Sequence, residues 1–419
     1  MKNFSNIPSV LNILSYQTTT PNYFIMKKFT YKTGVHTYIF LLLSFFTLVS
    51  CNDHESDEPT IDNNRSVLVY ILGNNSLSGN ANNDLSEMVY AAKNNLFKGT
   101  LLCFFDDYQP GATLYKIDKN GKSVIKQYPS GYKTATPSSI QEAVNTMKSL
   151  YPAPSYGLVL WSHGSGWMPS QSVYTRSPLR MLNYPLVKSG TSKAFGQDGS
   201  DWLELSDIKS SLNDHDFEFI IFDACYMGQV EVAYQLKDKA NYIIASPTEI
   251  LAEGFPYDKV APLFFERTPA IKDIASVYFE HYNAQTGANK SATVAAIDTR
   301  YMNLLGEYVK DVYASNREEL AALPLSQMQR FDRYSRHTMF DLGQIIREIA
   351  PEKYAGFNNI MSQAIVYKNF TPVMFQSFME FTITEENYSG LSSYIPSTSY
   401  ADLNSKYLET DWGKMVLGN

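Results

Sequence analysis

The chain has 419 residues, of which 44% are hydrophobic, 18% charged and 14% aromatic, and its formal net charge is −7. Such a composition is typical of a globular protein with ample material for a packed core, and its acidic balance argues against a nucleic-acid partner. The three cysteines lie in unrelated contexts, so the sequence predicts no disulfide framework, and Cys103 is expected to be a small buried hydrophobe.

The front of the chain predicts an export signal in residues 1–51. The segment Met26–Cys51 starts Met-Lys-Lys, continues into an apolar run and ends in Leu-Val-Ser-Cys. Positive charge, an apolar core and a small residue before the cut are typical of a secretory signal. The ending resembles the bacterial lipoprotein signal, which would lipidate Cys51 and anchor the exported protein to a membrane or the cell surface. The alternatives are secretion through a plain signal peptide and a short membrane anchor. Met26 is a candidate for the true start.

Residues 52–65 are predicted to be an acidic flexible tether. The stretch Asn52–Asn64 carries five acidic residues and no lysine or arginine, a composition that opposes folding. The folded part is then expected to comprise a core over 66–258 and a more helical region with short strands over 259–419, which completes the fold.

Apolar runs and helical spacing alternate along the core. The predicted buried strands are Ser66–Leu72, Thr100–Asp106, Gly157–Trp161, Phe219–Phe222, Asn241–Ser246 and Thr293–Asp298. The Asn-Gly pair at Asn120 predicts a hairpin between Thr113–Ile117 and Ser123–Tyr128. Helices are predicted over Asp84–Asn95, Ser138–Leu150, Glu204–Leu212 and Gln229–Lys239, and later strands over Val373–Thr384 and Gly390–Ile395. Alternating strands and helices predict an α/β sandwich with a mostly parallel sheet.

Two of these strands end in residues that can carry chemistry. The Gly157–Trp161 run leads into Ser-His163-Gly164, and the Phe219–Phe222 run leads into Asp-Ala-Cys225. Open α/β sheets place their sites at the carboxyl ends of strands, and a cysteine nucleophile needs a proton-transfer partner and oxyanion donors. His163 would be that partner, and the backbone N–H groups of Gly164 and Cys225 suit an oxyanion hole. A helix N-terminus after Cys225 would favour the thiolate.

Each residue alone has an ordinary structural explanation. A histidine at a strand end is usually a hydrogen-bonded structural residue, and a cysteine there is usually a small hydrophobic residue of the core. It is the joint pattern of the two strand ends that favours a cysteine nucleophile.

At these residues a resemblance appears. The segments Gly157–Trp167 and Asp223–Tyr234 resemble the catalytic segments of the clostripain family, cysteine endopeptidases with a caspase-like fold that are related to gingipains and legumain. Weaker matches are Phe340–Leu342 and Gly390–Pro396. The resemblance implies a three-layer α/β/α sandwich, a His163/Cys225 dyad and cleavage after arginine or lysine.

The family also implies an acidic pocket for the basic residue before the cut, the S1 pocket. Asp223 matches the family's Asp-x-Cys pattern, and Glu253, with Glu249 second, lies in the segment that resembles the family's acidic loop. Phe255 replaces the usual tryptophan there. The structural alternatives are a helix-capping acid for Asp223 and a solvated loop charge for Glu253.

Members of the family commonly mature by cutting themselves between the histidine and cysteine segments. The loop Met168–Ser200 offers four basic residues as candidate self-cleavage sites: Arg176, Arg180, Lys188 and Lys193. Some members need calcium, but no acidic stretch here has EF-hand spacing, so neither a metal nor a cofactor is predicted. The expected partners are protein or peptide substrates and, through Cys51, a membrane, and the chain is expected to be a monomer.

Two rival functions remain at this point. A surface lipoprotein with the same fold could bind peptides or glycans without cutting them. A hydrolase could instead use Ser162 or Ser165 beside His163, although the Gly-x-Ser-x-Gly elbow of such enzymes is absent.

Overall fold

A computed structural model of the chain describes residues 63–418, except 109–110, 169–194 and 334–336. Cys51, nearly all of the predicted tether and all four candidate self-cleavage residues lie outside the described residues. The described residues belong to a single compact unit.

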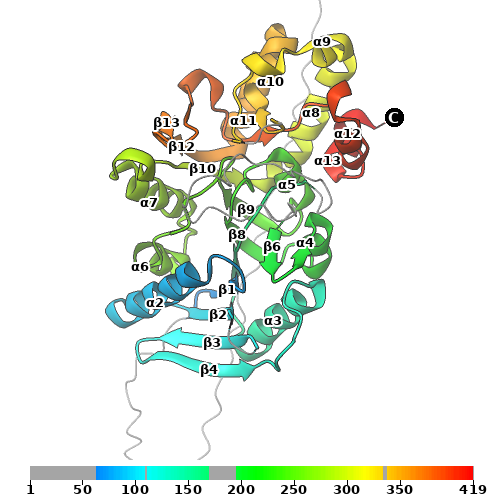
Figure 1. Ribbon diagram of the computed structural model, residues 1–419. Helices are drawn as coiled ribbons and strands as arrows, with labels where there is room; N and C mark the ends of the chain where they lie inside the picture. Colours follow the sequence, from blue (N-terminus) through cyan, green and yellow to red (C-terminus); the bar gives the residue numbers. More distant parts are fainter. Residues whose placement is uncertain (1–62, 109–110, 169–194, 334–336, 419) are drawn as a thin grey trace, which may run out of the picture. The chain divides into compact units, whose positions relative to one another are not determined.

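A sheet of nine strands runs through this unit (Figure 1). In spatial order its strands are β12 (Ile365–Phe370), β10 (Thr293–Asp298), β9 (Ala240–Ala245), β8 (Phe217–Asp223), β5 (Tyr156–Trp161), β1 (Ser66–Leu72), β2 (Thr100–Asp106), β3 (Thr113–Asp118) and β4 (Gly121–Gln127). The central run from β9 to β2 is parallel, and antiparallel pairs extend it at both edges. The chain leaves β1 toward β2 and returns to β5 on the other side. The crevice for a site therefore falls at the carboxyl ends of β1, β5 and β8.

Alternating side chains of the strands feed two separate cores, one on each face of the sheet. In β1, Leu68 and Tyr70 belong to one core, whereas Val67 and Val69 belong to the other. The second core is covered by α2 (Ser78–Asn94), α6 (Tyr257–Val260) and α7 (Ile271–Asn283). The first is covered by α3 (Pro137–Leu150), α4 (Leu205–Ser211), α5 (Val230–Gln235), α8 (Met302–Ser315), α9 (Arg317–Ala322), α10 (Leu342–Ile349), α11 (Tyr354–Ala364), α12 (Ala401–Tyr407) and α13 (Asp411–Leu417). The predicted three-layer α/β/α sandwich is confirmed.

The later part of the chain departs from the predicted elements. Val373–Thr384 is not one strand: β13 (Val373–Met374) and β14 (Phe381–Thr382) pair across a turn. Three residues of that turn, Phe375, Ser377 and Met379, adopt positive φ, which ends strand geometry. Further short pairs are β6 (Phe195–Asp198) with β7 (Asp201–Leu203), and β11 (Phe340–Asp341) with β15 (Ser392–Ser393). The edge strand β12 escaped prediction because its half-buried residues show no apolar alternation.

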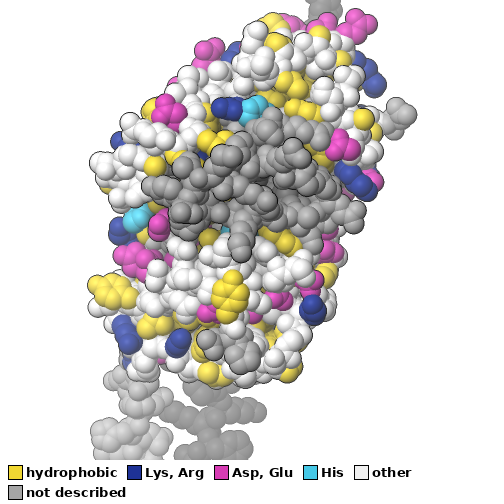
Figure 2. Space-filling view, viewed as in Figure 1, with side chains coloured by type: hydrophobic (Ala, Val, Ile, Leu, Met, Phe, Trp, Pro, Cys, Tyr) yellow, Lys and Arg dark blue, Asp and Glu magenta, His cyan; other side chains and the backbone are white. Residues whose placement is uncertain are grey.

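The described helices include no candidate membrane span, and the face of the molecule shown in Figure 2 carries no basic stripe. None of the described helices is long and apolar enough to cross a bilayer. On the face shown in Figure 2, acidic and basic side chains are interspersed, unlike the continuous basic patch of a nucleic-acid-binding protein.

Candidate active site

The loops that carry His163 and Cys225 leave neighbouring strands at the same level. β5 and β8 are parallel, and their register pairs Trp161 with Asp223. His163 and Cys225 each follow two residues later. The loops also touch: a Cβ placed on Gly164 would lie 2.6 Å from the carbonyl oxygen of Cys225. Only glycine allows so close an approach of the two backbones.

Both side chains line one cavity of about 420 Å³ at this edge of the sheet. Its wall also contains all three acids predicted from the sequence, Asp223, Glu249 and Glu253. Most of the remaining lining comes from the loop after β9, from Arg333 and from the turn between β13 and β14. A cavity that combines a thiol, an imidazole and several carboxyl groups contains the side chains that a cysteine hydrolase needs.

His163 is buried, and the loop after β1 orients its ring. Its Nε2 lies 3.0 Å from the Ser76 hydroxyl, and its ring stacks on Trp202 with centroids 6.3 Å apart. The backbone is also fixed, since the His163 carbonyl accepts from the Gly196 N–H at 3.0 Å. Burial lowers the pKa of His163 to about 4, so the imidazole is neutral at neutral pH.

Cys225 is partly buried and lies in a sharp turn. The next residue, Tyr226, has φ +64°, a sparsely populated region that often marks functional turns. The Ile250 N–H donates to the Cys225 sulfur at 3.4 Å. Burial, followed by the charge of Glu249, raises the pKa of the thiol to about 12.

The expected helix N-terminus beside Cys225 is wrong. α5 begins only at Val230, five residues after the thiol, and it has six residues. Since the effect of a helix dipole is confined to its first turn, it does not favour the thiolate here. The resting pair is therefore a neutral thiol and a neutral imidazole.

Asp223 forms the floor of the cavity. Its Oδ2 accepts from the Phe255 N–H and from the Tyr257 hydroxyl, each at 3.0 Å. Its Oδ1 is buried and has no hydrogen-bond partner among the described residues. Burial raises its pKa to about 6, so the carboxyl is charged at neutral pH. A buried carboxylate oxygen without a donor is costly unless a cationic group pairs with it.

A glycine makes room for this carboxylate. Gly254 has φ +63°, and a Cβ at that position would lie 2.6 Å from Asp223 Oδ2. The Tyr282 hydroxyl donates to the Gly254 carbonyl at 2.5 Å and holds the turn in place. Behind the cavity wall, the Trp161 indole donates to Asp84 at 2.7 Å, and burial raises the pKa of Asp84, which is therefore neutral.

The other two predicted acids differ in their surroundings. Glu253 is exposed at the cavity. Glu249 is already paired: the Arg333 Nε donates to its Oε2 at 2.6 Å, and the arginine's Nη2 forms an ion pair with the same oxygen.

The serine alternative does not suit Ser162. Its hydroxyl is buried, donates to the Leu72 carbonyl at 2.8 Å and accepts from the Gln197 N–H at 3.0 Å. Ser162, which directly follows β5, thus ties the end of β1 to β6. Among the described residues, no cluster of three or more His, Cys, Asp or Glu side chains could hold a metal ion.

Sequence reasoning missed three contributors to this site: Ser76, Ile250 and Arg333. Ser76 lies between the predicted strand Ser66–Leu72 and the predicted helix Asp84–Asn95, and nothing singles it out from its polar neighbours. Ile250 acts through its backbone, which side-chain patterns do not report. Arg333 lies more than a hundred residues after Cys225, and no local motif marks it.

The fold and the site define a cysteine peptidase of caspase-like architecture, and comparisons with known proteins place the chain within that class. The family model of the clostripain family, peptidase family C11, matches residues 69–414. The chain therefore belongs to the clostripain family.

Individual relatives agree with this assignment. Clostripain of Hathewaya histolytica is 25% identical over 223 residues, which cover 46% of this chain and 41% of that protein. An inactive zymogen C11 protease from Parabacteroides distasonis has a similar structure, with a TM-score of 0.73 and 30% identity, over 85% of this chain and 98% of that one. A secreted C11 cysteine protease from Bacteroides thetaiotaomicron, solved with an irreversible peptide inhibitor, has a TM-score of 0.70 and 27% identity over 85% and 100%.

Proposed function

We propose that this protein is a cysteine endopeptidase that cuts polypeptides after arginine or lysine with His163 and Cys225. The observation that carries the proposal is Asp223 Oδ1, a buried carboxylate oxygen that has no partner within the described part of the chain and belongs to the cavity that also holds the imidazole and the thiol. A P1 guanidinium or ammonium would supply its missing donors. The family membership and the inhibitor complex of the Bacteroides relative support the same assignment.

The reaction would start from the neutral pair. The Cys225 sulfur attacks the scissile carbonyl carbon as its proton passes to His163, and the N–H groups of Gly164 and Cys225 bind the resulting oxyanion. The tetrahedral intermediate collapses, the C–N bond breaks, and the leaving amine takes the proton from His163. Water then attacks the thioester while His163 accepts its proton, which releases the acid and restores the thiol.

The roles of the acids follow from their surroundings. Asp223 would pair with the P1 cation at the floor of the cavity, and Glu253, exposed at the cavity, would add attraction. Burial raises the pKa of Asp223, but only to about 6, so it keeps its charge under neutral conditions.

The test is a pair of reporter peptides that differ only in P1, arginine against its neutral isostere citrulline. We expect the arginine peptide to be cut and the citrulline peptide to be cut at least a hundredfold more slowly. Cys225→Ala should abolish both reactions. A Cys225→Ala protein that still cuts, or a wild type that binds the peptide without cutting it, would refute the proposal, and the latter would support the binding-protein alternative.

We further propose that the enzyme is exported and cuts itself in the loop that holds Arg176, Arg180, Lys188 and Lys193. The similar structures of an inactive zymogen and of a secreted protease support this. Intact-mass analysis should find a cut after one of these residues in the wild type and none in Cys225→Ala.

Lipid anchoring through Cys51 has its own test. Metabolic labelling with a palmitate analogue should mark the wild type but not Cys51→Ala. An unlabelled wild type would refute lipid anchoring.

A further inference from the structure

Arg333 is a cation enclosed in the wall of the catalytic cavity, with only 6% of its surface exposed. Besides its ion pair with Glu249, its guanidinium carbon lies 3.8 Å from the ring centroid of Phe375 and 5.4 Å from that of Phe378. The carboxylate binds the charge of the guanidinium and the aromatic rings contact its plane, so lysine would keep the charge beside Glu249 and lose the stacking. Arg333 is thus held by more contacts than a side chain in an exposed surface ion pair.

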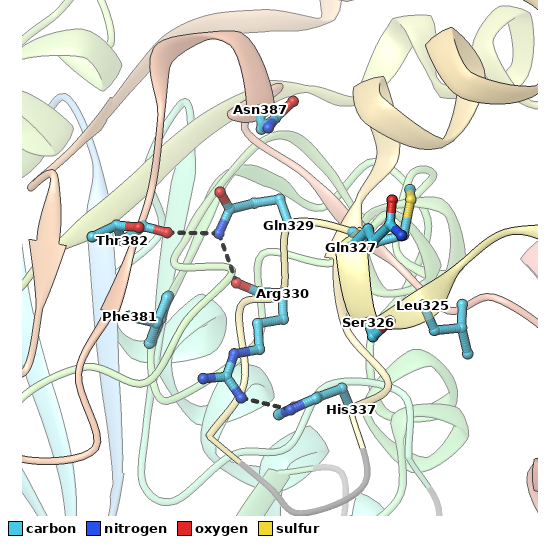
Figure 3. Close-up of a pocket in the computed structure, with 10 residues that line it drawn as sticks. Leu325, Ser326, Gln327, Gln329, Arg330, His337, Phe381, Thr382 and Asn387 are labelled. Atoms are coloured by element: carbon cyan, nitrogen blue, oxygen red, sulfur yellow. Dashed lines mark hydrogen bonds between the residues drawn. The ribbon is translucent and has the colours of Figure 1, made fainter.

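The segment that carries Arg333 is itself fixed by hydrogen bonds (Figure 3). The Gln329 side chain donates to the Thr382 carbonyl at 3.0 Å, and the Arg330 Nη1 donates to the His337 Nε2 at 2.5 Å. These groups line a second cavity of about 520 Å³. The backbone before Arg333 is thus anchored to β14. Little further conformational entropy is therefore lost when the Arg333 side chain pairs with Glu249.

The turn on the other side of Arg333 is strained. Phe375, Ser377 and Met379 all have positive φ, between +49° and +66°. Each such non-glycine residue persists only where its surroundings impose it. One constraint is Arg333, whose Nη1 donates to the Phe378 carbonyl at 3.3 Å. The arginine therefore joins this turn to the loop after β9.

The same loop holds the nucleophile. Glu249 directly precedes Ile250, whose N–H donates to the Cys225 sulfur and whose carbonyl lies 3.8 Å from it. The titratable and charged groups around this sulfur come from five parts of the fold: His163, Asp223, Glu249 and Glu253, Tyr278 and Arg333. Of these, the Glu249 carboxylate opposes ionisation of the thiol, and Arg333 favours it.

We infer that Arg333 is a positioning residue, which neutralises Glu249 and holds Ile250 against the Cys225 sulfur, and that Glu249 serves this pair rather than the substrate cation. The inference rests on the proposed function only in taking Cys225 as the nucleophile. An unpaired Glu249 would place a carboxylate near the thiol and free the loop that carries Ile250. Because the charges of Glu249 and Arg333 cancel, removing both should return the reactivity of the Cys225 thiol to its wild-type level.

The test is the rate of Cys225 alkylation by iodoacetamide between pH 6 and 10, read by peptide mass spectrometry, with buried Cys103 as the internal control. Arg333→Met should move the profile upward by about one pH unit, which is about a tenfold slower reaction on its acid side. The double variant Glu249→Gln/Arg333→Met should return to within threefold of the wild type. Arg333→Lys, which keeps the charge, should stay within threefold as well.

Three results of the alkylation assay would overturn the inference. They are an unchanged profile in Arg333→Met, a double variant as slow as that single variant, and a shift in Arg333→Lys as large as in Arg333→Met. If Arg333→Met does not fold, the double variant and Arg333→Lys still decide. A double variant with a normal profile that no longer prefers arginine over citrulline at P1 would assign Glu249 to the substrate. Because alkylation needs no turnover, failure of the peptidase proposal would leave this readout intact.

Discussion

At the scale of single residues, the site is a set of buried polar groups that lack some of their interaction partners. Only a bound substrate would supply them. Asp223 keeps one oxygen without a donor among the described residues, and His163 is desolvated into its neutral form. The Cys225 thiol is neutral as well. Since burial disfavours the charged forms of His163 and Cys225, we expect the imidazolium and the thiolate to form only when a substrate enters.

Asp223→Asn should selectively weaken the use of basic substrates. The amide keeps the size of the side chain but removes the charge, so kcat/KM for an arginine peptide should fall about a hundredfold. Alkylation of Cys225 by neutral iodoacetamide, the control, should change by less than threefold. Equal losses in both assays would instead show a general collapse of the site.

The pH dependence of kcat/KM tests the same carboxyl. Burial raises the pKa of Asp223 to about 6, so the charge that binds the P1 cation is present above pH 6 and is lost as the pH falls below it. For an arginine peptide, kcat/KM should therefore decline below pH 6. In Asp223→Asn this limb should vanish, because the pKa of His163 lies lower, at about 4. A limb that survives the substitution would assign the titration to another group.

At the scale of elements, the site depends on how closely the loops after β5 and β8 approach. Gly164→Ala would place a methyl group 2.6 Å from the Cys225 carbonyl, a backbone atom that cannot move without the nucleophile. We expect kcat to fall at least tenfold and the free energy of unfolding to fall by about 1–3 kcal/mol. Gly79→Ala in α2, where a Cβ would meet nothing within 4 Å, is the matched control and should lower neither kcat nor the free energy of unfolding. Full activity in Gly164→Ala would contradict the proposed contact.

The contact between α5 and β15 should make stability depend on pH. The buried Glu231 accepts from the Ser393 hydroxyl and the Tyr394 N–H, each at 2.9 Å, and burial raises its pKa to about 7. The folded chain thus holds a proton that the unfolded chain releases between about pH 4.5 and 7. This contribution is complete at low pH and is lost as the pH rises through 7. Urea unfolding should show a decline in stability toward pH 8, and Glu231→Gln should make that decline smaller by about 1–3 kcal/mol.

The sequence allowed the elements of the catalytic edge to be predicted well, and for a physical reason. β5 and β8 are buried on both faces, so they appear as uninterrupted apolar runs whose ends fall just before His163 and Cys225. Arg333 and the β13–β14 turn could not be predicted, because they reach the cavity through tertiary packing that leaves no periodic pattern. The short α5 shows the same limit: apolar spacing predicted a helix over Gln229–Lys239, but the helix forms only over Val230–Gln235.

At the scale of the whole molecule, the segment 63–258, which contains His163 and Cys225, and the segment 259–418 share one sheet and both cores. β9 pairs with β10, Phe255 stacks on Tyr278 with centroids 4.4 Å apart, and Tyr234 packs edge-on against Trp412. A fragment of residues 63–258 would expose the edge of β9 and would lack many of the residues that fill both cores.

Such a fragment should therefore fail to fold. In size-exclusion chromatography we expect it to aggregate, with no cooperative thermal transition by circular dichroism. The matched control, residues 63–419, should be monomeric and melt cooperatively. A soluble 63–258 fragment with a sharp transition would contradict the shared cores.

The central claim is that two neighbouring strand ends bring an imidazole and a thiol together in a pocket built for a cation, and covalent labelling tests it most directly. A peptidyl chloromethyl ketone that ends in arginine should modify the protein once, on Cys225, as shown by peptide mapping. The same reagent ending in citrulline should react at least a hundredfold more slowly, and His163→Ala should lose most of the labelling. Modification of a different residue, or equal labelling by both reagents, would contradict the account.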